Sequence, residues 1–216
     1  MVQALVFDAY GTLYDVHSVV RRCETCYPGK GAQLSQLWRA KQLEYTWQRS
    51  LMQRYAPFSQ VTREALEYSC SALGLELDAS LMEEYLRLAP FPEVKSALER
   101  LTMKKAILSN GSPDLLDPLV GNSGLALDAV LSVDEVKIYK PAPQVYELAV
   151  KHLKTPREKI AFVSSNCWDA LGAKSFGFRV YWVNRGGAPV ERLGVRPDAT
   201  VRDLGELVSQ LAPMNA

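Results

Sequence analysis

The sequence has no apolar run that approaches the roughly 20 residues of a membrane-spanning helix. It also has no excess of one charge, because 25 lysines and arginines and 24 aspartates and glutamates leave a formal net charge of +1. We therefore expect neither nucleic acid nor membrane as a partner. The first apolar stretch, residues 4–7, has no basic segment before it and ends at Asp8, which predicts a core strand and not a signal peptide. We expect a cytoplasmic protein.

Residues that bind transition metals are also scarce, since the chain has two histidines and four cysteines. Cys23 and Cys26 form a single CxxC pair, but no second pair and no nearby histidines complete a zinc site. The pair also lacks the thioredoxin-like context of a redox motif. We expect reduced structural thiols, and we expect His17 and His152 to be solvated surface residues.

The sequence does contain several short, continuous apolar runs that are rich in β-forming residues. They cover residues 4–7, 106–108, 129–131, 160–163 and 180–183. Such runs are typical of strands that are buried on both faces of a sheet. Helical spacing lies between the later runs, for example at Val94, Ala97, Leu98 and Leu101. The alternation predicts an α/β protein with a parallel sheet.

The segment of residues 14–90 has a different pattern. It contains no convincing strand, shows long helical patterns and is rich in large side chains such as Trp38 and Trp47. The sequence Pro90-Phe91-Pro92 is a natural hinge at its end. We therefore predict a discontinuous core domain, residues 1–13 and 91–216, interrupted by a helical cap domain of residues 14–90. Residues 203–211 read as a final surface helix.

Four polar clusters follow the predicted strands, at the ends where open parallel sheets bind ligands. They are residues 8–12, 109–114, 140–141 and 164–169. Each has an ordinary structural interpretation: Asp8 as a turn residue, residues 109–114 as a helix cap, Lys140 as a surface lysine and Asp169 as a partner of a helix dipole. A functional interpretation is that a carboxylate, a cation and an anion-binding turn meet at one edge of the sheet.

Taken together, the clusters resemble the motifs of the haloacid dehalogenase superfamily, and within it those of the 2-haloacid dehalogenases. The core motifs are Asp8-Ala9-Tyr10-Gly11-Thr12-Leu13, Ser109-Asn110-Gly111, Lys140-Pro141 and Ser164-Ser165-Asn166-Cys167-Trp168-Asp169. The cap adds Trp38-Arg39 and residues 41–47. The resemblance implies a Rossmann-like parallel sheet core with an inserted helical cap. No recognisable site residue follows residue 185.

Two absences distinguish the subfamilies. Phosphatases of this superfamily carry a second aspartate two positions after the nucleophile, where this chain has Tyr10. They also hold magnesium with an acidic pair in the last motif, where this chain has Ser164, Ser165, Asn166 and only Asp169. The resemblance therefore implies an enzyme that needs no metal and no other cofactor.

The resemblance further implies hydrolytic dehalogenation of a small (S)-2-halo carboxylic acid. Asp8 attacks C2, halide leaves, and water hydrolyses the resulting ester to the (R)-2-hydroxyacid. The implied catalytic residues are Asp8, Thr12, Arg39, Lys140, Ser164, Asn166 and Asp169. The implied substrate-binding residues are Ala9, Tyr10, Arg39, Leu43, Phe58, Ser109, Asn110, Tyr146 and Trp168.

Within these sets the expected roles differ. Lys140 orients Asp8, and Arg39 stabilises the departing halide. Ser109, Asn110 and the backbone at Ala9 and Tyr10 hold the substrate carboxylate. Ser164, Asn166 and Asp169 position the hydrolytic water, and an apolar wall is formed by Leu43, Phe58 and Trp168. Ala40 stands where relatives often have glutamine, which predicts a roomier pocket.

Two alternatives remain open at this point. One is a phosphatase of the same fold that acts on a small phosphoester and requires metal. The other is a non-catalytic, dimer-forming relative whose aromatic-rich cap is an interaction surface. The apolar surface of the cap also leads us to expect a homodimer in the catalytic case.

Overall fold

The computed structural model describes residues 2–211, and its centre is a six-stranded sheet in the order β3-β2-β1-β4-β5-β6. The strands are β1 (Ala4–Phe7), β2 (Lys104–Ser109), β3 (Ala129–Ser132), β4 (Ile160–Ser164), β5 (Arg179–Val183) and β6 (Ala199–Val201). All neighbouring pairs run parallel. The five predicted strands and the α/β class are confirmed. β6 lies outside the prediction because its three residues make too short an apolar run.

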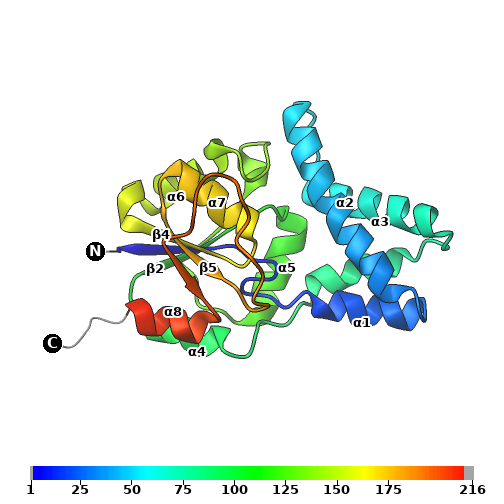
Figure 1. Ribbon diagram of the computed structural model, residues 1–216, viewed down its shortest axis with the longest axis horizontal. Coiled ribbons are helices and arrows are strands. Elements are labelled where there is room, and N and C mark those ends of the chain that lie inside the picture. Colours follow the sequence, from blue (N-terminus) through cyan, green and yellow to red (C-terminus); the bar gives the residue numbers. More distant parts are fainter. Residues whose placement is uncertain (1, 212–216) are drawn as a thin grey trace.

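Helices cover both faces of this sheet. Figure 1 shows α6 and α7 on one face, and α4 and α8 on the other. Their bounds are α4 (Val94–Arg100), α5 (Pro113–Ser123), α6 (Pro143–Leu153), α7 (Cys167–Phe176) and α8 (Leu204–Leu211). The last helix thus begins within one residue of its predicted start. It buries Leu204, Leu207 and Val208 beside α4, so only part of it is surface.

β1 occupies the middle of the sheet, between β2 and β4. Its four residues are fully buried, as expected for an apolar run covered on both faces. The strand ends at Phe7, so the next residue, Asp8, emerges at the centre of the carboxyl edge. The parallel register places the ends of β2 and β4 on either side of it.

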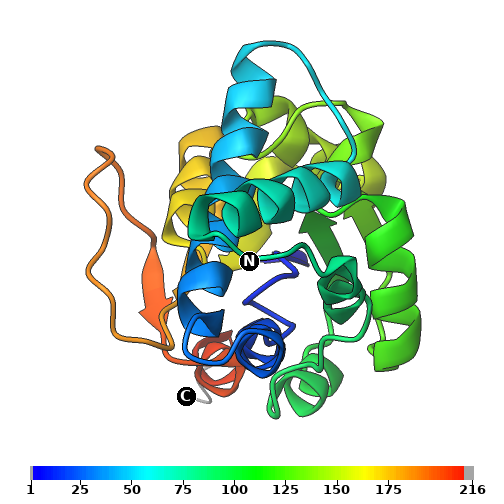
Figure 2. The ribbon, with the colours of Figure 1, turned by 90° about the vertical axis from the view of Figure 1, so that its right-hand side faces the viewer.

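The segment between β1 and α4 is built from helices: α1 (His17–Cys26), α2 (Gly31–Leu51), α3 (Phe58–Leu73) and the 3-10 helix η1 (Ala79–Leu86). We refer to residues 14–90 as the helical insert. α2 packs against both α1 and α3 around the buried Leu34, Trp38 and Val61. Figure 2 views the molecule from the insert side, with these helices in front of the carboxyl ends of the strands.

Two adjacent segments connect the insert to the sheet. The N–H of Asp15 donates to the carbonyl of Ala89 at 2.8 Å, and the N–H of Phe91 donates to the carbonyl of Leu13 at 3.0 Å. Tyr14 forms an isolated bridge with Pro90 between these two bonds. The chain therefore leaves the sheet and returns to it side by side, directly after the Asp8 loop.

Within residues 2–211, every helix is too short or too polar to span a bilayer. The four cysteines are free thiols, and burial raises the pKa of Cys23 to about 12. His17 and His152 are exposed, as predicted. His152 nevertheless has a partner that the sequence does not indicate, because its Nε2 lies 2.9 Å from a carboxylate oxygen of Glu135.

Candidate active site

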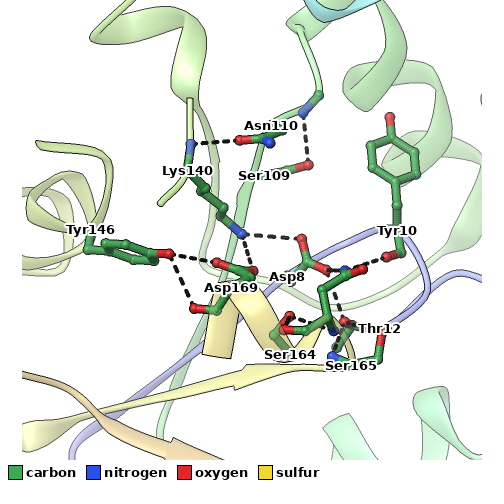
Figure 3. Close-up of polar contacts among 12 residues, drawn as sticks. Asp8, Tyr10, Thr12, Ser109, Asn110, Lys140, Tyr146, Ser164, Ser165 and Asp169 are labelled. Atoms are coloured by element: carbon green, nitrogen blue, oxygen red, sulfur yellow. Dashed lines mark hydrogen bonds and ion pairs between the residues drawn. The ribbon is translucent and has the colours of Figure 1, made fainter. Parts of the chain in front are cut away.

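Asp8 is held from three directions at the carboxyl end of β1. Lys140 Nζ lies 3.2 Å from Oδ1, while Thr12 Oγ1 and Asn166 Nδ2 donate to Oδ2 at 3.0 Å and 2.8 Å (Figure 3). The residue is only 6% exposed. A carboxylate at this depth requires such donors, because burial without them is costly. This burial and these contacts exclude the alternative interpretation of Asp8 as a solvated turn residue.

The loop that follows Asp8 turns tightly around Gly11. Three successive N–H groups, of residues 12–14, converge on the carbonyl of Ala9. Gly11 has φ of +83°, and a Cβ at this position would lie 3.1 Å from Ser165 Oγ. Glycine is therefore favoured here by both backbone conformation and space. The turn brings the Thr12 hydroxyl back over the Asp8 carboxylate.

Lys140 links Asp8 to a second buried carboxylate. Its Nζ lies 2.8 Å from Asp169 Oδ2 as well as 3.2 Å from Asp8 Oδ1, and its side chain is 1% exposed. The ammonium also lies 5.0 Å from the centroid of the Phe162 ring. Burial alone lowers the pKa of Lys140, but Asp169 and Asp8 outweigh it, so the pKa is raised above its ordinary value. Lys140 is therefore a charged, buried residue and not a surface lysine.

Asp169, in the first turn of α7, is fully buried. Burial raises the pKa of Asp169 and the Lys140 ammonium lowers it, with a result of about 6. Because this value is still below 7, the carboxylate is ionised at neutral pH. Tyr146 Oη donates to Asp169 Oδ1 at 2.8 Å. Tyr146 is fully buried and its ring packs edge-on against Phe162. The structure thus places Tyr146 against Asp169, and the substrate contact that we expected for it stays a prediction.

The turn after β2 is organised by its own side chains. Ser109 Oγ accepts from the N–H of Gly111 at 3.0 Å, and Asn110 Oδ1 accepts from the N–H of Lys140 at 3.0 Å. Both side chains are buried, and α5 begins at Pro113 as predicted. The Asn110 amide nitrogen makes no hydrogen bond to another residue of the described range 2–211. It remains available to an anion.

The Ser164 side chain does not reach Asp8. Its Oγ accepts from the N–H of Asn166 at 3.1 Å and closes the turn before α7. Ser165, which we did not assign to the site, is the serine that contacts the Asp8 loop. Its N–H donates to Thr12 Oγ1 at 2.8 Å, and its Oγ lies 3.1 Å from the same atom. The Asp8 carboxylate can only accept, whereas the Ser165 hydroxyl can donate to Thr12 Oγ1, so the Thr12 proton is assigned to Asp8.

Aromatic side chains from the loop and the insert form a wall beside the carboxylate. Tyr10 stacks on Phe58, with ring centroids 5.9 Å apart, and meets Tyr85 edge-on at 5.8 Å. Tyr10 is 3% exposed, and its hydroxyl has no hydrogen-bond partner among the described residues. Burial raises the pKa of Tyr10 far above its ordinary range. Tyr85 was not indicated by the sequence, because no motif surrounds it.

A second aromatic contact joins the sheet to the insert. The rings of Trp168, at the start of α7, and Trp47, on α2, pack edge to face with centroids 5.5 Å apart. Leu43 lies one turn before Trp47 on α2 and is half-buried, so the two side chains share a helix face. Ala40 is exposed, and the roomier pocket expected at this position stays a prediction.

Arg39 projects from α2 and is half-buried. Its Nη1 donates to Gln42 Oε1 at 2.8 Å, and Gln42 Nε2 in turn donates to Thr62 Oγ1 at 2.8 Å. The Arg39 charge acts to lower the pKa of both Tyr10 and Tyr85, against the larger raising effect of burial. Gln42 is fully buried and was not assigned a role. A polar residue four positions after the buried Trp38 was the signal for it.

The other residues expected at the site lie around the Asp8 carboxylate. Thr12, Lys140 and Asn166 contact the Asp8 carboxylate, Asn166 Nδ2 also donates to the carbonyl of Tyr10 at 3.2 Å, and Asp169 shares the Lys140 ammonium. Among residues 2–211, no group of three or more histidine, cysteine, aspartate or glutamate side chains is arranged to hold a metal ion. The arrangement is a buried carboxylate, Asp8, that shares a lysine with a second buried carboxylate, Asp169, beneath the helical insert.

A carboxylate of this kind, directly after the central strand of a parallel sheet, defines a hydrolase of the haloacid dehalogenase type. Residues 2–177 match the model of the haloacid dehalogenase-like hydrolase family. The (S)-2-haloacid dehalogenase H-109 of Pseudomonas putida is 52% identical over 95% of this chain and 96% of its own length. The chain belongs to this family and, within it, to the (S)-2-haloacid dehalogenases, as the motifs predict.

Solved structures support the same assignment. A crystal structure of an L-2-haloacid dehalogenase superposes with a TM-score of 0.95 at 46% identity, covering 97% of this chain and 98% of the other. The L-2-haloacid dehalogenase from Xanthobacter autotrophicus, with chloropropionic acid covalently bound, gives a TM-score of 0.92 at 43% identity, covering 99% and 100%.

Proposed function

We propose that this protein converts short (S)-2-haloacids into (R)-2-hydroxyacids and halide through an ester on Asp8. The observation that carries the proposal is the Asp8 carboxylate itself, buried, held by three donors and adjacent to the Lys140 ammonium. The covalent chloropropionate complex of the Xanthobacter autotrophicus relative supports an ester route. Two half-reactions, displacement of halide by Asp8 and hydrolysis of the ester, then replace one difficult displacement by water.

In the first half-reaction, an Asp8 oxygen attacks C2, the C2–O bond forms and the C2–halogen bond breaks with inversion. Oδ2 accepts two hydrogen bonds and Oδ1 only one, so Oδ1 has the freer lone pair. We therefore assign the attack to Oδ1. Burial keeps this oxygen poorly hydrated, which favours its reaction with carbon.

In the second half-reaction, water attacks the carbonyl carbon of the ester. The bond between that carbon and the oxygen attached to C2 then breaks, and a proton from the water passes to this oxygen. The C2–O bond survives, so the configuration at C2 does not change again. Asp169 is ionised at neutral pH and lies within the same hydrogen-bonded group, which supports its role in orienting water. Asn166, through its contact with Asp8, would stabilise the negative oxygen of the intermediate.

The substrate itself is assigned to the space between the Asp8 loop and the insert. Ser109, Asn110 and the backbone at Ala9 and Tyr10 would hold the carboxylate. Arg39 would receive the halide, and the wall of Leu43, Phe58 and Trp168 would exclude water. The division of the chain into a core domain and a cap domain, with the substrate between them, belongs to this proposal.

The test is halide release from a panel of two- to four-carbon 2-halo acids by chelator-stripped protein, assayed with EDTA and with added magnesium. We expect release in both conditions from the (S) enantiomers, with (R)-hydroxyacid as product. Activity that requires magnesium, or that appears only with phosphoesters, would favour a phosphatase. No turnover of either class would favour the non-catalytic relative.

A single turnover with excess enzyme in ¹⁸O-water tests the ester directly. The product oxygen should come from Asp8 and carry no label, while the label enters the Asp8 peptide. Label in the first-turnover product would show that water attacks C2 directly. Racemic product from one enantiomer would contradict in-line attack.

We also propose a cytoplasmic homodimer. The four free cysteines suit a reducing compartment. The end of α2 exposes Trp47, Leu51 and Met52, at 36%, 86% and 58%, beside an apolar pocket of about 340 Å³ that includes Ile138 and Ala142. Light scattering at micromolar concentration should give twice the monomer mass, and Leu51→Glu should shift the protein toward monomer. A monomeric wild-type protein would exclude the dimer.

A further inference from the structure

Arg185 lies two residues beyond the end of β5, in the part of the chain for which the sequence indicated no role. Its guanidinium makes three contacts. Nη2 donates to the carbonyl of Thr12 at 3.1 Å, Nη1 lies 2.7 Å from Glu93 Oε1, and the central carbon lies 3.8 Å from the centroid of the Phe91 ring. The side chain is 23% exposed, so these contacts are shielded from water more than those of a surface ion pair.

The three partners come from the two segments that connect the insert to the sheet. Thr12 lies on the segment that leaves the sheet, and Phe91 and Glu93 lie on the segment that returns. These segments are already joined by the bond from the N–H of Phe91 to the carbonyl of Leu13. Arg185 adds a third element, the loop after β5, so one planar group fixes all three relative to one another.

The contact with Thr12 connects this junction to the nucleophile. The carbonyl of Thr12 is bound by Arg185, while its hydroxyl donates to Asp8 Oδ2 at 3.0 Å and accepts from the N–H of Ser165. Because the hydroxyl and the carbonyl belong to one residue, fixing the peptide restricts where the hydroxyl points. A shift of about 1 Å in a catalytic group can cost roughly 10²-fold in rate.

We propose that Arg185 is a positioning residue for Asp8, acting through the Thr12 carbonyl and the junction with the insert. It does not touch the substrate. It holds the Asp8 loop in its reactive geometry while the insert moves or is strained by ligand. This inference rests on the proposed dehalogenase function, because halide release is its readout.

Arg157 provides a matched control. Its guanidinium also contacts a carbonyl, a carboxylate and an aromatic ring: Phe176 O at 3.3 Å, Glu147 Oε2 at 3.9 Å and the Phe176 ring at 4.7 Å. Arg157 precedes β4, so it lies at the amino edge of the sheet, whereas Asp8 lies at the carboxyl edge. Arg157→Met therefore removes the same kinds of contact without touching the Asp8 loop.

The experiment compares Arg185→Met, Arg185→Lys and Arg157→Met with the wild type. Methionine retains an apolar chain over Phe91 but removes the carbonyl and carboxylate contacts. We expect Arg185→Met to lower kcat and the single-turnover rate of ester formation by about 10- to 100-fold, with KM changed by less than about 3-fold. Arg185→Lys should recover part of kcat, and Arg157→Met should leave kcat within about 2-fold.

Thermal unfolding of all three variants separates positioning from stability. Similar decreases in Tm for Arg185→Met and Arg157→Met, with kcat lowered only in the first, would support the inference. Unchanged kcat in Arg185→Met would overturn it, as would equal kcat losses in both methionine variants. If Arg185→Met does not fold, Arg185→Lys is compared with the wild type instead: a lowered kcat would support the inference, and an unchanged kcat would overturn it. A wild type that releases no halide would contradict the proposed function instead.

Discussion

Asp8→Asn should abolish halide release, with a loss of at least about 10⁵-fold, comparable to the removal of other covalent nucleophiles. The amide has no negative oxygen to attack C2. Its NH₂ group must also face donors, because all three groups around Asp8, from Lys140, Thr12 and Asn166, donate hydrogen bonds. Halide release under substrate saturation and the mass of the Asp8 peptide after single turnover measure the effect.

Asp198→Asn is the control for this substitution. Asp198 also pairs with a lysine, Lys174 at 2.7 Å, and accepts the N–H of Val180 at 2.8 Å, but it lies directly before β6, at the amino edge of the sheet and not at the carboxyl edge that holds Asp8. It should retain near-normal turnover. Turnover of Asp8→Asn above about 1% of wild type, in protein with an unchanged circular dichroism spectrum, would remove Asp8 as the nucleophile.

Arg39→Ala should lower dehalogenation by about 10²–10³-fold, the usual effect of removing one preorganised charge partner of a transition state. The leaving halide gains negative charge as the C2–halogen bond breaks. Arg39 is prepositioned for such charge by Gln42, which is itself fixed by Thr62. The loss should be larger in the ester-forming step than in ester hydrolysis, and quenched-flow measurement of the two steps tests this directly.

Arg49→Ala is the matched control, since Arg49 is also a half-buried arginine of α2 and is bound to Glu64 and to the carbonyl of Arg54. Neither partner of Arg49 belongs to the site around Asp8, so its removal should leave the rate of halide release nearly unchanged. Equal rates for wild type and Arg39→Ala, with the fold intact, would assign the halide to another group.

The sequence was sufficient for five of the six strands and for the residue at the centre of the carboxyl edge. A continuous apolar run must be covered on both faces, so the carboxylate that follows it, Asp8, emerges at the ligand-binding edge. The lysine and Asp169 could be associated with it because their motifs also follow strands. These inferences depend on the periodicity of strands and on topology, which local sequence determines well.

Other assignments depended on side-chain direction, which local sequence does not determine. Tyr146 is close to the site in the fold, but its hydroxyl is directed to Asp169 by packing against Phe162. Ser164 Oγ accepts the backbone N–H of Asn166 and so stabilises its own turn, which local sequence did not indicate, and its role toward water stays a prediction. Arg185 acts through partners more than ninety residues away in the chain, so no local pattern reveals it.

The lysine shared between two carboxylates has a consequence for the order of events in each catalytic cycle. In the resting site, Asp8, Asp169 and Lys140 sum to one negative charge, and formation of the ester makes Asp8 neutral and brings the sum to zero. Hydrolysis restores the negative charge of Asp8 just as a hydroxyacid carboxylate has been released beside it. The Asp8 carboxylate and the product carboxylate then repel each other in a poorly hydrated site, where Coulomb interactions are stronger than in water. The reaction thereby switches the site from retaining an anion during the ester stage to expelling one at its end.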